Sequence, residues 1–324
     1  MMQSFEALGH RILGRLGLCR HQIYHRPAPS PLLDANVANS LIAQAIQRGT
    51  PCLISRLGTP ESNGILNQID LRFTRHSSAA VRLVARMQGR YQDWAPRTRE
   101  LLENNGGFFP LTDECLERFA PLYADCIAEM DMVGYWGIVP GEAFLIRNHA
   151  PRAVAFDPKA FEPYFFDPPW SAALEGRRVL VIHPFAESIQ RQYRRRQLLF
   201  EDARVLPPFE LLTIPAVQSL AGAATPFPTW FEAKAWMEAE MDKHNYDVAL
   251  VGAGSYGLPL CAYAKRKGKV AIHTGGSTQI LFGIRGRRWD EMPEFARFFN
   301  EAWVRPLSAE GIPGGAKVEN SCYW

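Results

Sequence analysis

Two glycine-rich turns near the C-terminal end of this 324-residue chain carry the residue types best suited to holding a phosphate. The first reads GAGSYG and follows the apolar run 247–251, and the second lies in HTGGSTQ at the end of the next apolar run. Glycine lets the backbone turn tightly, and N–H groups at a helix start can bind phosphate. The candidate phosphate-contacting residues are Gly252, Gly254, Ser255, Gly257, Gly275, Gly276 and Gln279. The alternative is that the turns only pack strands against helices.

The residues that follow the first turn exclude two common functions of such a loop. NAD binding requires an acidic residue near the end of the next strand, but no Asp or Glu occurs between Ser255 and Arg288. A serine hydrolase requires an acid and then a histidine after Ser255, but the only later histidine is His273 and no carboxylate lies between them. Phosphate recognition without dinucleotide recognition remains. It suits a nucleotide-sugar diphosphate bound in a cleft at the carboxyl edge of a sheet.

A second candidate group lies upstream, in the segment SRLGTPE after the short apolar run CLIS. Arg56 ends the predicted strand beside Gly58, whose small size lets a ligand approach, and a guanidinium can hold a diphosphate through two parallel hydrogen bonds. Glu61 is a candidate general base, because a carboxylate can take the proton from a hydroxyl. The alternatives are a structural ion pair for Arg56 and a helix-start cap for Glu61.

Three further polar residues are expected at the same edge of the sheet. His183, a candidate catalytic residue, ends the run RVLVIH, and Ser188 follows at a helix start, where its hydroxyl and N–H can meet phosphate. Arg288, in GIRGRRW, is a candidate to neutralise the negative charge of a diphosphate. For His183, a purely structural histidine is the competing interpretation.

Alternating strand and helix patterns position these groups. The predicted strands cover residues 52–55, 178–183, 210–214, 247–251 and 270–273, and the predicted helices cover 34–47, 78–92, 113–130, 187–199, 229–244 and 258–267. Continuous apolar runs are typical of parallel strands that are buried on both faces. The alternation predicts an α/β fold, a Rossmann-like and mostly parallel sheet with helices on both faces. We expect residues 34–324 to form one domain.

Composition indicates a globular protein that does not bind nucleic acid. Hydrophobic residues make up 47% of the chain and charged residues 21%, and the net charge of +3 is too small for a nucleic-acid partner. Six cysteines without a CxxC pair are typical of reduced thiols in the cytoplasm. No apolar window approaches the ~18 residues of a membrane span.

Residues 1–33 differ from the rest of the chain, because they contain no acidic residue after Glu6. Apolar residues recur there at helical spacing between Arg11, Arg15, Arg20 and Arg26. Such a basic amphipathic extension is able to lie on an anionic membrane surface, which would place the protein peripherally on the cytoplasmic face. The alternative is that this helix packs on the domain.

The C-terminal half of the chain resembles the GT-D glycosyltransferases, in which a strand, a glycine turn, a helix and a second strand ending in glycine follow in this order. The segments HPFAESI at 183–189, GGSTQILFGIRGRRW at 275–289 and the final CYW also resemble a group of bacterial proteins associated with surface polysaccharides. The resemblance implies a GT-D-like fold. It also implies transfer of a sugar from a nucleotide-diphosphate donor to an oligosaccharide, lipid-linked or protein acceptor.

The upstream segment resembles the donor site of the same family, an Arg-x-Gly followed by an Asp-x-Glu that binds a divalent metal. Arg56, Gly58 and Glu61 match this pattern, so the resemblance implies Mn²⁺ or Mg²⁺ at Glu61. Thr59 replaces the aspartate, however. Two alternatives therefore stay open: a non-catalytic module that binds nucleotide or polysaccharide, and a pyruvyl, phosphoryl or other phosphate-handling transferase.

Overall fold

The computed structural model describes residues 2–312 and 323–324, and its centre is a single eight-stranded sheet in the order β1-β4-β3-β2-β8-β7-β5-β6. Every strand pair in it is parallel. The strands are β1 (Leu32–Leu33), β2 (Cys52–Arg56), β3 (Met132–Gly134), β4 (Val154–Phe156), β5 (Arg178–His183), β6 (Glu210–Pro215), β7 (Val248–Val251) and β8 (Val270–Ile272). The predicted α/β fold class is confirmed.

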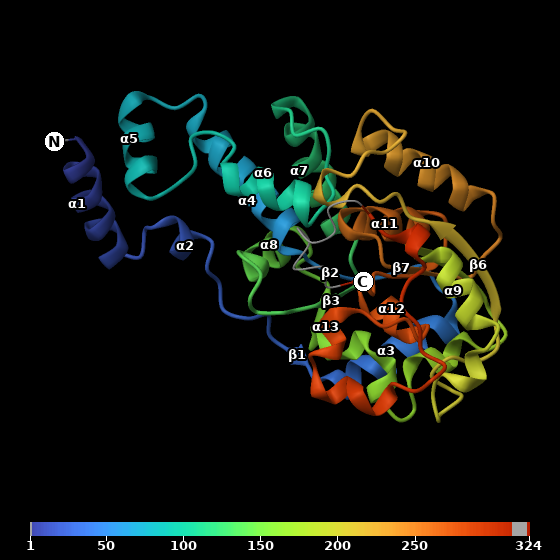
Figure 1. Ribbon diagram of the computed structural model, residues 1–324. Helices are drawn as coiled ribbons and strands as arrows, with labels where there is room; N and C mark the ends of the chain where they lie inside the picture. The colour runs from blue at the N-terminus through green and yellow to red at the C-terminus, as the bar shows by residue number, and fades with distance from the viewer. Residues whose placement is uncertain (1, 313–322) are drawn as a thin grey trace.

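Helices cover both faces of this sheet (Figure 1). The helices are α1 (Met2–Arg15), α2 (Arg20–Ile23), α3 (Ala35–Arg48), α4 (Thr59–Thr74), α5 (Ala79–Met87), α6 (Pro96–Asn104), α7 (Asp113–Ala128), α8 (Glu142–His149), α9 (Ala186–Tyr193), α10 (Trp230–Asp242), α11 (Gly257–Arg266), α12 (Ser277–Leu281) and α13 (Arg287–Asp290). Residues of α4, α7, α8, α10 and α11 share one apolar core, and residues of α3, α9, α12 and α13 share the other.

The strands separate these two cores because successive side chains of a strand point to opposite faces. In β5, Leu180 and Ile182 pack into the core with α11, whereas Val179 and Val181 pack into the core with α3. All four side chains are fully buried. Burial on both faces explains why the sequence of this strand is continuously apolar rather than alternating.

Helix α3 has the boundaries that its end residues predict. The carboxylate of Asp34 accepts hydrogen bonds from the N–H groups of Asn36 and Val37, and Gly49 ends the helix with a φ of +64°. Both features are preferred helix ends, since the first supplies acceptors for otherwise unpaired N–H groups and the second needs no Cβ.

Helix α4 was absent from the prediction, because its sequence lacks an apolar stripe. Its buried residues include Asn67, Gln68 and Asp70, which satisfy their polar groups within the fold. Asn67 donates to the carbonyl of Asp93 and accepts from the N–H of Ala95. A helix that buries polar side chains in this way resembles a loop when only hydrophobicity is considered.

The N-terminal residues are tied to the rest of the fold at two points. Strand β1 pairs with β4, so the last two residues of the predicted extension belong to the edge of the sheet. Helix α1 contacts α5, and Figure 1 shows this pair projecting away from the sheet. Within the described residues, none of the helices combines the length and apolar character needed to span a bilayer.

Candidate functional site

A cleft opens at the carboxyl edge of the sheet, where the chain leaves neighbouring strands in opposite directions. β5 is followed by β6 on one side, whereas β7 is followed by β8 on the other. Ligands bind in open α/β sheets at such a point. The cleft has a turn part, lined by His183, Phe185, Gln218, Gly252, Gly275, Gly276, Gln279 and Trp324, and a carboxylate part, lined by Gly58, Glu61, Trp136, His273 and Arg288. Arg56, Asn105, Gly254 and Tyr323 line both parts.

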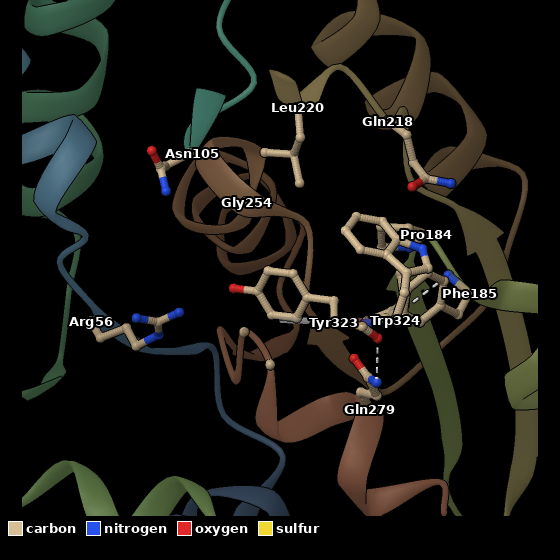
Figure 2. Close-up of a pocket in the computed structure, with 14 residues that line it drawn as sticks. Arg56, Asn105, Pro184, Phe185, Gln218, Leu220, Gly254, Gln279, Tyr323 and Trp324 are labelled. Carbon is tan, nitrogen blue, oxygen red and sulfur yellow. Dashed lines mark hydrogen bonds between the residues drawn. The ribbon is translucent and has the colours of Figure 1, made fainter. Parts of the chain in front are cut away.

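Arg56 ends β2 and lies where the two parts meet. Its guanidinium packs on the backbone of Gly275, because a Cβ added there would stand 2.3 Å from Nη2. The guanidinium also lies 5.7 Å from the ring centroid of Trp136, and Figure 2 shows it pointing toward Tyr323. In the described part of the chain, no carboxylate lies within ion-pair distance of Arg56. The nearest acidic influence on its charge comes from Glu61 and Glu142, whose pKa values burial raises and the guanidinium lowers without forming an ion pair.

Glu61 lies in the first turn of α4 and is 6% exposed. Its carboxylate lies against Gly58, since a Cβ added to Gly58 would stand 2.0 Å from Oε2. Burial raises the pKa of Glu61, although its own backbone N–H and the charge of Arg56 oppose the shift. A carboxylate with a raised pKa is a stronger base than an exposed one, which is a property suited to proton transfer near neutral pH.

The two glycine turns lie side by side above the ends of β7 and β8. A Cβ on Gly252 would stand 2.6 Å from the carbonyl oxygen of Gly275 and 2.7 Å from Cδ2 of His183. Gly275 has a φ of +57°, a conformation that side-chain-bearing residues rarely adopt. Glycine at these positions lets three strand ends approach each other closely.

His183 contributes a neutral imidazole. Its Nδ1 accepts a hydrogen bond from the N–H of Phe185 at 3.0 Å, which leaves the ring proton on Nε2. Burial lowers the pKa of His183 to about 3. The ring therefore offers a hydrogen-bond donor to the cleft at neutral pH rather than a positive charge.

Three of the predicted residues do not line the cleft. Oγ of Ser188 donates to the carboxylate of Glu310, and the same carboxylate accepts the N–H of Ser188 at 3.1 Å. Glu310 thus occupies the helix start that was expected to meet phosphate. Oγ of Ser255 accepts from Nε1 of Trp230 at 2.9 Å, and Gly257 packs on the ring of His273, so both residues are used in packing.

Aromatic residues form one wall of the turn part. The carbonyl of Tyr323 accepts a hydrogen bond from Nε2 of Gln279 at 2.9 Å, and the ring of Trp324 packs edge-on against Phe185 at 6.0 Å (Figure 2). Oε1 of Gln279 and Nε1 of Trp324 are buried without a hydrogen-bond partner among the described residues. Gln279 is fully buried. Such unpaired groups are costly unless a ligand or water satisfies them.

Arg288 lies at the border of the carboxylate part. Its guanidinium is 5.1 Å from the ring centroid of Tyr323 and 5.9 Å from that of Trp289. The ring of Trp289 is buried and packs against Gly276. Cys322 of the CYW ending lies outside the described residues.

The turn part of the cleft is built from a segment that is similar to a known family. Residues 167–281, which contain β5 to β8 and both glycine turns, match the family model of the GT-D fold-like domain. The chain carries a GT-D-like domain. No curated protein and no solved structure is significantly similar to the chain. Arg56 and Glu61 lie outside the matched residues, so their roles depend on their position in the cleft.

The residues beside the GT-D-like domain do not fit a divalent metal held by the protein. Glu61 is the sole carboxylate of the segment SRLGTPE, and burial raises its pKa. Across the described residues, no group of three or more His, Cys, Asp and Glu side chains is arranged to hold a metal ion. Mg²⁺ and Mn²⁺ prefer several oxygen ligands, usually from ionised carboxylates.

Glu142 supports the site from behind its lining, and the sequence did not indicate this role. It starts α8, is 2% exposed, and its carboxylate accepts hydrogen bonds from the N–H groups of Trp136 at 3.0 Å and Gly137 at 2.8 Å. Burial raises its pKa to about 7, with a smaller opposing effect from Arg56. Glu142 therefore holds the loop that brings Trp136 beside the guanidinium of Arg56. Asn105, Gln218 and Leu220 were also missed, because they line the cleft from segments without any periodic pattern.

Proposed function

We propose that the chain is a glycosyltransferase that moves a sugar from a nucleotide-diphosphate donor to an oligosaccharide, lipid-linked or protein acceptor in the assembly of bacterial surface polysaccharide. The GT-D-like domain supports the glycosyltransferase type of fold. The cleft at the carboxyl ends of its strands supports the location of the donor.

The observation that carries this proposal is the guanidinium of Arg56, which has no carboxylate partner within ion-pair distance in the described part of the chain. It lies beside Gly275, and Gly254 lines the same part of the cleft. A guanidinium and the backbone of two glycine turns together suit the two phosphates of a nucleotide-sugar diphosphate. The polar atoms that Gln279 and Trp324 leave unpaired are suited to hydrogen bonds with the ribose, the base or the donor sugar.

In the proposed reaction, Glu61 takes the proton from the acceptor hydroxyl. The acceptor oxygen then forms a bond to the anomeric carbon of the donor sugar, and the bond between this carbon and the diphosphate oxygen breaks. The nucleoside diphosphate leaves with the bonding electrons, and Arg56 stabilises the charge that develops on it. The Nε2–H of His183 is a second hydrogen-bond donor, in the turn part of the cleft.

A non-catalytic module that binds a nucleotide or a polysaccharide is the second candidate. The absence of a three-residue metal cluster within the described residues favours it, because many transferases hold the diphosphate through a metal ion. The transferase and a nucleotide-binding module both predict donor binding, and only the transferase predicts turnover.

Calorimetric titration with UDP-, GDP- and dTDP-sugars, followed by measurement of released nucleoside diphosphate, tests the proposal. Arg56→Ala is expected to weaken donor binding by about 10- to 100-fold, since hydrogen bonds to charged groups contribute roughly 1.5–3 kcal/mol. The matched control is Arg194→Ala. Arg194 is an exposed arginine at the end of α9, so this variant should bind the donors as the wild type does. Binding without release of nucleoside diphosphate indicates the module. Failure to bind any of the three donors refutes the transferase and the nucleotide-binding module.

A further inference from the structure

Exposed apolar side chains are concentrated on the helical pair that projects from the sheet. Of the fourteen exposed large apolar residues in the described part of the chain, eight lie between residues 8 and 18 or between 73 and 84. They are Leu8, Ile12, Leu16, Leu18, Phe73, Val81, Leu83 and Val84. We call α1, α5 and the residues that flank them the projecting surface. Exposed apolar residues scattered singly need no explanation, whereas a concentration marks an interaction site.

The charge of the projecting surface has one sign. The sequence contains no acidic residue between Ala7 and Leu33, nor between Leu71 and Gln92, although the two stretches are far apart along the chain. The contact between α1 and α5 brings them together. Arginines at positions 11, 15, 72 and 82 are exposed there. The one nearby acid on α1, Glu6, forms an ion pair with Arg86.

On α1, the apolar and basic residues lie in adjacent rows. Leu8 and Ile12 are one helical turn apart and are 52% and 51% exposed, and Arg11 and Arg15 follow the neighbouring row. A different side of the helix carries the contact with α5, where a Cβ on Gly9 would stand 2.0 Å from Cε of Met87. The exposed row is therefore the side of α1 that the rest of the fold leaves uncovered.

Buried contacts hold the projecting surface in a fixed position. The fully buried carboxylate of Asp70 on α4 accepts hydrogen bonds from Nε of Arg20 at 2.6 Å and from the hydroxyl of Tyr24 at 2.7 Å. Arg90, just after α5, lies 3.8 Å from the same carboxylate. The N–H of Arg20 also donates to the carbonyl of Gln88 at 2.7 Å. These contacts connect the residues that follow α1 with the residues that follow α5. They therefore fix the position of the projecting surface relative to α4.

We propose that the projecting surface docks the protein on an anionic lipid membrane. Apolar side chains would enter the boundary between headgroups and acyl chains while the arginines contact lipid phosphates. Charge complementarity selects an anionic bilayer over a second copy of this chain, since two copies would bring two basic surfaces together. The proposal is independent of the sugar-transfer reaction and extends the predicted role of residues 1–33 to α5.

Co-sedimentation of the full chain with vesicles at low salt tests this proposal. One set of vesicles contains equal amounts of phosphatidylglycerol and phosphatidylcholine, and the other contains phosphatidylcholine alone. We expect binding to the first set only. The double variant Ile12→Gln and Arg15→Glu should bind at least about tenfold more weakly, because each arginine near an anionic surface contributes about 1 kcal/mol and a buried isoleucine more.

The matched control is the double variant Leu198→Gln and Arg194→Glu, which makes the same two chemical changes at exposed residues far from α1. Circular dichroism melting establishes that each variant is folded. Four outcomes overturn the proposal. Three concern the vesicles: no binding to anionic vesicles, equal binding to both vesicle types, or an equal loss of binding in the control variant. The fourth is a dimer in sedimentation velocity that the variant Ile12→Gln and Arg15→Glu dissociates, while vesicles are not bound.

Discussion

Replacing Gly275 by alanine tests the placement of Arg56, because the change moves the guanidinium without removing it. The new Cβ would stand 2.3 Å from Nη2 of Arg56, whereas non-bonded heavy atoms prefer about 3.5 Å. The guanidinium must therefore move by about 1 Å or more, which is enough to break charge-assisted hydrogen bonds to a diphosphate. The loss of one or two such bonds, at roughly 1.5 kcal/mol each, predicts about 10- to 100-fold weaker binding of a nucleoside diphosphate.

The same substitution has a separate cost to stability that a control variant can isolate. Gly275 has a φ of +57°, and an alanine in this conformation costs about 1–2 kcal/mol. Gly176 has a φ of +68°, and nothing lies within 4 Å of its added Cβ. Gly176→Ala should therefore lose similar stability in urea denaturation while binding the nucleotide normally in calorimetry. Unchanged nucleotide affinity in Gly275→Ala, at a stability equal to that of Gly176→Ala, would refute the contact between Arg56 and the diphosphate.

Three further predictions concern buried carboxylates. Glu61→Gln should lower turnover by about 100-fold or more in a donor-consumption assay with little change in melting temperature, and activity within a few-fold of wild type would exclude it as the base. Below the ordinary glutamate pKa, Glu142 is protonated in both the folded and the unfolded chain. At a pH above that value Glu142 ionises first in the unfolded chain, because burial raises its pKa in the folded chain to about 7. Stability contributed by Glu142 is therefore lost as the pH rises from about 5 to about 8, and Glu142→Gln should flatten this decline in urea denaturation, whereas an unaltered slope assigns it to other groups. Asp70→Asn should destabilise the protein by about 3–5 kcal/mol, because two arginines lose their buried partner, and hydrogen exchange should increase first in α1 and α2; uniform or absent change would contradict this.

The sheet could be predicted from sequence where burial alone determines the pattern. β5, β6, β7 and β8 are continuous apolar runs or nearly so, and the glycine turns after β7 and β8 follow from their position. β3 and β4 were missed because each has only three residues, too few to show a period. Their position in the sheet depends on pairing with β2 and β1, which is tertiary information.

The site was predictable only where its residues could be recognised from local sequence features. Arg56, Gly252 and Gly275 were identified because their types and their places after strands are local features. Glu142 was not, because its raised pKa depends on burial and on a loop that folds back over it. Ser188 was expected to be available at its helix start, but Glu310, more than a hundred residues later, occupies that place. The sequence shows which side chains are able to take part in chemistry. It does not show which of them form hydrogen bonds with residues from distant segments and are therefore unavailable to a ligand.

The order of strands has a consequence for the synthesis of this protein on the ribosome. Every strand on one side of the junction between β2 and β8 comes from residues 32–156, and every strand on the other side comes from residues 178–272. The junction pairs Cys52 with Val270, so β2 remains an unpaired edge until most of the chain has emerged. Arg56 and Glu61 belong to the first half and the glycine turns to the second. The donor site that we propose is therefore complete only when the nascent halves join, and the proposal predicts that nucleotide affinity reports on the last step of folding.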